Sequence, residues 1–239
     1  MKKSTLWVAG LLLVIGATAS QAKLGVDATA STGLFGRYVF RGARLSSTSL
    51  QTDLALTKQF SSQLTGTAYF WTTHALAPAA GDIRFQEADY DISLNWKPSS
   101  VWGLTGGWVY YDAIHPGWDY ADTAEIYGKL DFHGWKGAPG ISLFYDHQNA
   151  VGLYGDLHAS KSFPISDGFV LNTYGEVGFN FNAEKMTHGL IRTAVGIDLG
   201  HGWSASPRVD WWFPTAFSDA AANGFRPEVA ATIAYSTNF

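Results

Sequence analysis

The stretch "EVAATIAYSTNF", from Glu228 to Phe239, carries an alternating pattern. One face of the predicted strand is apolar and holds Val229, Ala231, Ile233, Tyr235 and Phe239. The other face is small or polar and holds Glu228, Ala230, Thr232, Ala234, Ser236 and Asn238. A period of two residues indicates a β-strand with one apolar face. An aromatic residue at the end of such a strand predicts the last strand of a membrane barrel, with Phe239 at the periplasmic interface.

The same alternation recurs along the chain. It is clearest in "ADYDISLNWK" (Ala88–Lys97), where every second residue is apolar and those between them are polar. Applied everywhere, this test predicts about twelve strands, within a range of about 10–14. They are expected near 26–41, 48–60, 64–73, 85–97, 101–112, 122–132, 140–147, 151–162, 169–181, 188–199, 203–213 and 225–239.

The connections between these strands alternate in length. Short ones such as 98–100 and 200–202 alternate with longer ones such as 74–84 and 214–224. Periplasmic turns and longer extracellular loops give this pattern in outer-membrane barrels. Aromatic residues also cluster at both ends of the strands, as two membrane interfaces favour, whereas a soluble β-sandwich has no such need. The predicted fold is therefore all-β, a transmembrane antiparallel up-and-down β-barrel that closes because lipid leaves no backbone group unpaired.

The composition fits strands that face lipid on one side and water on the other. Charged residues make up 15% of the chain, against about 25% in typical soluble domains. Aromatic residues also reach 15%, yet the mean hydropathy is close to zero. The chain has no cysteine, which excludes disulfide frameworks and thiolate metal sites. Its seven histidines lack metal-ligand spacing, so no metal or other cofactor is expected.

The N-terminus predicts export. A basic "MKK" precedes the apolar run 6–17, and Ser20 and Ala22 provide the small residues of a cleavage site. This pattern predicts a signal peptide over 1–22 rather than a membrane anchor, with the barrel over 23–239 and a location in the bacterial outer membrane. Subtracting Lys2 and Lys3 from the 16 basic side chains leaves 14 against 20 acidic ones, a net charge of −6. Such a balance argues against nucleic acid as a partner.

Two segments resemble a known family. "GRYVFRGARLSSTSLQTDL" (Gly36–Leu54) resembles the first hairpin of the TorF family of proteobacterial outer-membrane porins. The matching residues there are Tyr38, Phe40, Arg41 and Gly42. "WVYYDAIHPGWDYADTAEIY" (Trp108–Tyr127) is similar to the family's middle hairpin, and its matching residues are Tyr110, Tyr111, Pro116, Gly117, Glu125 and Tyr127. The resemblance implies an outer-membrane barrel and names no substrate.

The polar faces of the strands place charged residues toward the lumen. An acidic wall is predicted from Glu87, Asp89, Asp91, Glu125, Asp146, Asp156 and Glu176. A basic wall is predicted from Arg37, Arg41, Arg192, Arg208 and Arg226. Opposed walls in a water-filled pore would create a transverse field that orients dipolar solutes. The alternative is that the charges pair and close the lumen, with Arg41 on Glu228, and Arg192 between Glu176 and Asp210.

The predicted function is a porin-like channel for passive passage of small hydrophilic solutes or ions. The alternative is a structural or surface-interaction barrel with a salt-bridged, closed lumen. A third reading, a lipid-modifying enzyme using His158 and Ser160, lacks an acid or amide to orient the pair, so no enzyme is predicted. The expected partners are the lipid bilayer, lipopolysaccharide, small polar solutes and the outer-membrane assembly machinery. Tyr235 and Phe239 resemble the assembly signal read by that machinery.

Overall fold

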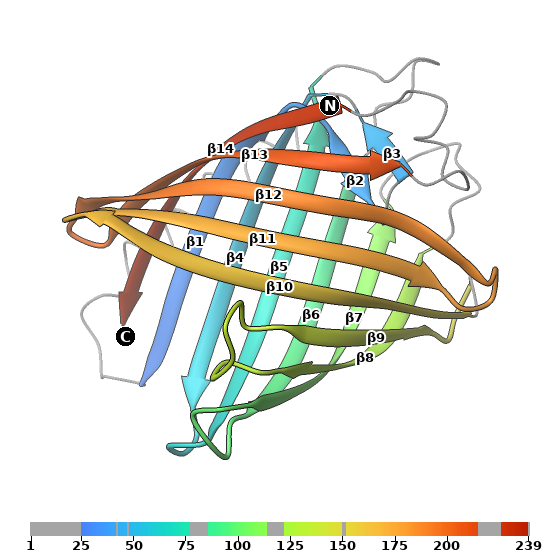
Figure 1. Cartoon of the computed structure of the whole chain (residues 1–239), viewed down its shortest axis with the longest axis horizontal. Coiled ribbons are helices and arrows are strands. Elements are labelled where there is room, and N and C mark those ends of the chain that lie inside the picture. The colour runs from blue at the N-terminus through green and yellow to red at the C-terminus, as the bar shows by residue number, and fades with distance from the viewer. Residues whose placement is uncertain are drawn as a thin grey trace.

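The computed structural model describes residues 25–41, 43–46, 48–76, 86–113, 122–149, 152–214 and 226–238. Twelve strands close into an antiparallel barrel, and two more form a separate hairpin (Figure 1). The barrel strands are β1 (Val26–Phe35), β4 (Ser49–Gln59), β5 (Leu64–Ala75), β6 (Gln86–Trp96), β7 (Gly103–Ala113), β8 (Thr123–Asp131), β9 (Gly140–Asp146), β10 (Gly152–Ser166), β11 (Phe169–Asn180), β12 (Lys185–Gly200), β13 (Trp203–Pro214) and β14 (Arg226–Asn238). The hairpin strands are β2 (Tyr38–Phe40) and β3 (Ala43–Ser46). Within the described ranges, no helix has the length and apolar character needed to cross a membrane.

The barrel strands pair with their neighbours in chain order, and the ring closes where β1 meets β14. In this seam Asp27 lies opposite Asn238, and Phe35 lies opposite Ala230. The start of β1 and the end of β14 therefore lie at the same end of the barrel. The predicted twelve-strand, antiparallel, up-and-down barrel is confirmed.

The predicted first strand, 26–41, is wrong at its end. β1 stops at Phe35, and the Gly36 N–H makes a last bond to the Val229 carbonyl at 2.9 Å. The chain then leaves the sheet and forms the β2–β3 hairpin, which turns at Arg41 with a φ of +48°. Because β2 and β3 bond to each other, this segment needs no partner in the barrel wall.

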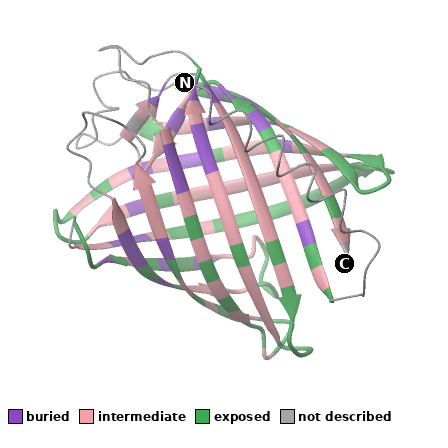
Figure 2. Ribbon diagram, turned by 180° about the vertical axis from the view of Figure 1, so that it is seen from behind, coloured by how far each residue is buried: buried purple, intermediate pink, exposed green. Residues whose placement is uncertain are grey.

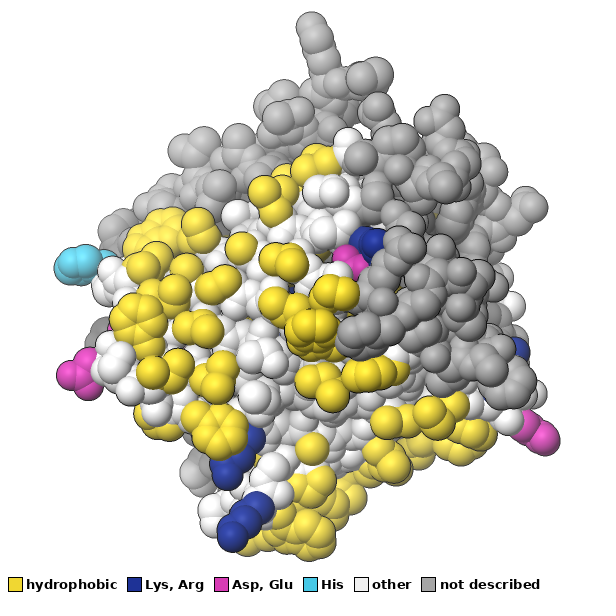
Figure 3. Space-filling model, turned by 45° about the horizontal axis from the view of Figure 1, so that its top comes forward, with side chains coloured by type: hydrophobic (Ala, Val, Ile, Leu, Met, Phe, Trp, Pro, Cys, Tyr) yellow, Lys and Arg dark blue, Asp and Glu magenta, His cyan; other side chains and the backbone are white. Residues whose placement is uncertain are grey.

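The outer surface of the barrel is apolar. On β6, the side chains of Tyr90, Ile92, Leu94 and Trp96 are exposed, as the alternation in that stretch predicts, and Ile92 is 59% exposed. Hydrophobic side chains spread over the face seen in Figure 3, and the described charged side chains visible there lie mostly at its margins. A closed barrel with such a surface is suited to the hydrocarbon of a bilayer.

The buried residues gather toward one end of the barrel and include many polar ones. Thr73, Glu87, Glu125, Asp210 and Glu228 are all at most 8% exposed. They lie near the strand ends that adjoin the β2–β3 hairpin, and Figure 2 shows buried segments concentrated toward one end of the strands. Polar and apolar side chains therefore share the buried zone where the hairpin meets the inner wall.

Candidate functional site in the barrel lumen

The tip of the β2–β3 hairpin is bound to the inner wall through Arg41. The Nη1 and Nη2 groups of Arg41 donate to the two carboxylate oxygens of Glu125 on β8 at 2.6 and 2.8 Å. The same carboxylate accepts a bond from the Tyr111 hydroxyl at 2.9 Å. The guanidinium lies over the Tyr154 ring, 4.0 Å from its centroid. The predicted pair between Arg41 and Glu228 is wrong, because the hairpin carries Arg41 across the lumen and away from β14.

The base of the hairpin is fixed on other strands. Arg37 takes the predicted place of Arg41, with its Nη1 at 2.9 Å from Glu228 Oε1 on β14. The Tyr38 hydroxyl hydrogen-bonds to Glu87 on β6, and the Tyr38 ring lies 5.1 Å from the Trp71 ring on β5. Contacts on β5, β6, β8 and β14 together show that the hairpin lies inside the lumen.

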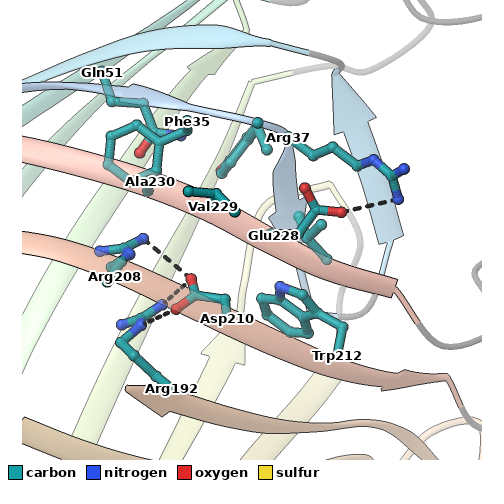
Figure 4. A pocket seen from close by; sticks show the side chains of 13 residues that line it. Phe35, Arg37, Gln51, Arg192, Arg208, Asp210, Trp212, Glu228, Val229 and Ala230 are labelled. Atoms are coloured by element: carbon teal, nitrogen blue, oxygen red, sulfur yellow. Dashed lines mark hydrogen bonds and ion pairs between the residues drawn. The ribbon is translucent and has the colours of Figure 1, made fainter. Parts of the chain in front are cut away.

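A smaller cavity lies between the hairpin and strands β12 to β14 (Figure 4). Its volume is about 180 Å³. Arg192 donates from Nε and Nη2 to both oxygens of Asp210 at 2.7 and 2.9 Å, and Arg208 Nη2 lies 3.3 Å from the same carboxylate. Arg37 and Glu228 form the second group of charges in this cavity. Arg192 and Arg208 thus share one acid, Asp210, whereas Arg37 has its own partner in Glu228.

A larger cavity of about 450 Å³ lies on the other side of the hairpin. His158 lies between two carboxylates there, with Nδ1 at 2.8 Å from Asp156 and Nε2 at 2.9 Å from Asp131. Glu176 pairs with His188 at 2.8 Å and accepts the Tyr174 hydroxyl at 2.5 Å. Of the two acids predicted beside Arg192, Asp210 is therefore its direct partner and Glu176 bonds elsewhere.

The remaining predicted residues are distributed along the wall. Asp146 accepts a bond from the Thr123 hydroxyl at 2.7 Å. Asp91 hydrogen-bonds with Tyr127, and Asp89 lies one inward position from Glu87 on β6. The Arg226 side chain and Phe239 lie outside the described parts of the molecule. Tyr235 packs its ring 5.0 Å from that of Trp203. The transverse field between opposed walls stays a prediction.

Several lumen residues were not predicted from the sequence. Lys129 lines the larger cavity on the same face of β8 as Glu125, and its ammonium lies 4.8 Å from the centre of the Tyr127 ring. Tyr154, His188 and Trp212 also line that cavity. All of these residues occupy inward positions of their strands, as the predicted acidic residues do. The sequence prediction names only charged residues, and it omits Lys129. The described residues contain no group of three or more His, Asp or Glu arranged to hold a metal ion.

The expectation that no acid lies beside His158 is wrong, because Asp156 and Asp131 both contact its ring. The arrangement nevertheless differs from that of a Ser–His catalytic pair. Both ring nitrogens of His158 lie within hydrogen-bond distance of carboxylates, so neither is left to accept the proton of the Ser160 hydroxyl. The lumen instead offers charged and hydroxyl side chains that can bind a polar solute.

No family model matches the chain, and no curated protein matches it. Solved structures do resemble it. The NanC porin has a TM-score of 0.54 at 10% identity, over 87% of this chain and 98% of that one. The KdgM porin has a TM-score of 0.53 at 7% identity, over 89% and 99%. The COG4313 outer membrane channel from Pseudomonas putida F1 has a TM-score of 0.52 at 10% identity, over 92% and 98%.

The same barrel architecture also occurs in an enzyme. The outer membrane phospholipase A from Escherichia coli has a TM-score of 0.50 at 9% identity, over 87% of this chain and 92% of that one. At these identities the likeness concerns the fold. The closed twelve-strand barrel of outer-membrane proteins, with its apolar outer surface, locates the chain in the lipid bilayer of a bacterial outer membrane.

Proposed function

We propose that this protein is an outer-membrane channel for passive passage of small hydrophilic solutes or ions, narrowed by the β2–β3 hairpin. The observation that carries the proposal is the pair of cavities on the two sides of the hairpin, of about 180 and about 450 Å³. Charged and hydroxyl side chains line both of them. Twelve strands enclose a lumen between the filled eight-strand barrels and the open sixteen-strand porins, so a partly filled passage fits this size.

The porin and channel neighbours support this function, and one of them, the KdgM porin, has been solved in complex with disordered oligogalacturonate. The likeness of 36–54 and 108–127 to TorF-family porins supports membership of that family. We include in the proposal a signal peptide over 1–22, contacts with lipopolysaccharide, and delivery by the outer-membrane assembly machinery through Tyr235 and Phe239.

The second candidate is a structural or surface-interaction barrel with a closed lumen. The ion pairs favour it, because Arg37, Arg41 and Arg192 each lie on a carboxylate in the lumen. If these pairs persist, the hairpin blocks the lumen between β8 and β14. The two candidates differ in whether water and ions pass the hairpin.

Planar-bilayer recordings separate the candidates. The full chain is compared with a variant in which 38–46 is replaced by a Gly–Ser linker of equal length. The proposal expects single-channel steps from the unmodified protein and steps several-fold larger from the variant. Steps from the variant alone would support the closed barrel. Silence from both proteins, inserted and folded, would reject the channel.

A further inference from the structure

The smaller cavity carries an excess of positive charge. Among the described residues, three arginines line it, Arg37, Arg192 and Arg208, against two carboxylates, Asp210 and Glu228. Arg192 forms a two-bond pair with Asp210, and Arg37 forms an ion pair with Glu228. Once these pairs are formed, one guanidinium charge is left over in the cavity. A cavity of this sign favours an anion.

The excess charge belongs to Arg208. Within the part of the chain that the structure describes, its one carboxylate contact is the 3.3 Å approach of Nη2 to Asp210 Oδ2, the oxygen to which Arg192 already donates at 2.9 Å. Its Nε is buried and has no acceptor among the described residues. The Phe35 ring holds the guanidinium in place from one side, 4.7 Å from Cζ. Arg208 is therefore fixed in position while its donors are incompletely used, and its side chain remains 23% exposed.

The size and lining of the cavity limit the anion. A volume of about 180 Å³ is smaller than the ~300–1,000 Å³ of sites for drug-sized ligands, so the occupant has few atoms. The cavity wall also includes the apolar side chains of Phe35, Val39 and Trp212, which suit a short apolar chain. A guanidinium matches the two oxygens of a carboxylate through its planar array of N–H donors.

We propose that Arg208 is the centre of a binding site for small monocarboxylates, with the carboxylate on the Arg208 guanidinium and the alkyl group against Trp212 and Phe35. As a substrate class this rests on the proposed channel function. As a binding site it stands without it, because the geometry requires no passage through the barrel.

Direct binding tests the site separately from conduction. Saturation-transfer NMR on the full chain in detergent measures the Kd of propionate, of the neutral isostere propionamide, and of inorganic phosphate. We expect propionate to bind at least about tenfold more tightly than propionamide, since only propionate completes charge-assisted bonds. Phosphate binding tighter than propionate would overturn the assignment to carboxylates, as would equal binding of propionate and propionamide.

Matched variants locate the site. Arg208→Gln is expected to raise the propionate Kd by about tenfold or more, whereas Lys129→Gln, which removes the same charge from the larger cavity, leaves it within about twofold. Equal shifts in the two variants would reject the site in favour of a general field effect. If Arg208→Gln does not fold, Arg208→Lys is tested in its place, because it keeps the positive charge. It should still weaken propionate binding, since an ammonium lacks the planar N–H donors of a guanidinium. Unchanged affinity in Arg208→Lys would contradict the proposed contact.

Conductance then distinguishes the two proposals. If the protein binds propionate but passes no current, the binding site is supported and the channel function is rejected. If the protein conducts but shows no preference for propionate over propionamide, the channel function is supported and the binding site is rejected.

Discussion

Arg41 and Glu125 lie 84 residues apart in the sequence and join the hairpin tip to β8 by two hydrogen bonds of 2.6 and 2.8 Å. The Glu125 side chain is only 3% exposed, so solvent does little to screen this pair. Three aromatic rings, Phe40, Phe144 and Tyr154, lie within 5.1 Å of the guanidinium carbon. This pair fixes how far the hairpin reaches across the lumen.

Glu125→Gln should release the hairpin tip. It leaves the buried Arg41 cation without its counter-charge, and breaking such a pair costs about 3–5 kcal/mol of unfolding free energy. Urea unfolding followed by tryptophan fluorescence measures the loss. The same variant should show larger and noisier single-channel steps. Lys161→Gln, an exposed site, serves as the control and should stay within about 0.5 kcal/mol. A Glu125→Gln protein as stable as the unmodified one would show that the pair contributes nothing net.

Two adjacent glycines should respond in opposite ways to alanine. A Cβ on Gly107 would lie 2.4 Å from Tyr127 Cζ, whereas the nearest atom to a Cβ on Gly106 is 4.0 Å away. Gly107→Ala should therefore destabilise the barrel by about 1–3 kcal/mol through the clash with the ring. Gly106→Ala should be neutral or stabilise by up to about 1 kcal/mol, because it lowers the entropy of the unfolded chain. Equal effects in urea unfolding would mean that Tyr127 does not lie on Gly107.

A charged residue introduced at an outward position should destabilise the barrel more than one introduced at an inward position. Ile92→Arg places a cation on the lipid face and should cost about 2–4 kcal/mol. Asn95→Arg, on the same strand but facing the lumen, loses only the 2.8 Å bond to Thr105 and should cost about 1 kcal/mol. Reversible unfolding in phospholipid vesicles compares the two. A larger loss for Asn95→Arg would contradict the inward and outward assignment of β6.

Arg208→Glu should shift ion selectivity toward cations. The change converts the excess positive charge of the smaller cavity into a negative one, and lumen charges set the sign of the preferred ion. The reversal potential in a salt gradient measures the shift. The predicted opposed walls also require a shift from Arg192→Glu, and an unchanged reversal potential in both variants would reject them.

His158→Ala should leave membrane lipids unchanged. The imidazole is held between Asp156 and Asp131, so its loss should affect the larger cavity and not a lipid-modifying reaction. Lipid profiles of cells that lack the protein are compared with those of cells carrying the variant. If the unmodified protein alters lipid composition and the variant does not, His158 is part of a catalytic site.

Alternation of apolar and polar residues predicts most of this fold, because successive residues of each barrel strand face lipid and the lumen in turn. Tyr90 to Trp96 shows this most clearly. The hairpin escapes the same reasoning, since Tyr38 and Phe40 alternate as they would in a wall strand. Its position depends on Arg41 meeting Glu125 and Arg37 meeting Glu228, contacts between residues far apart in the chain. The alternation of inward and outward positions along each strand identifies the residues that line the lumen. It does not show which charged side chains form ion pairs.

The hairpin also has a mechanical consequence. It connects β14, through Arg37 and Glu228, with β6 and β8 at other points of the ring. A ring of strands can flatten only if the distances across it change. Links that cross the ring oppose this change, because the barrel cannot become elliptical without stretching them. The segment that narrows the lumen therefore also stiffens the barrel against compression by the surrounding membrane.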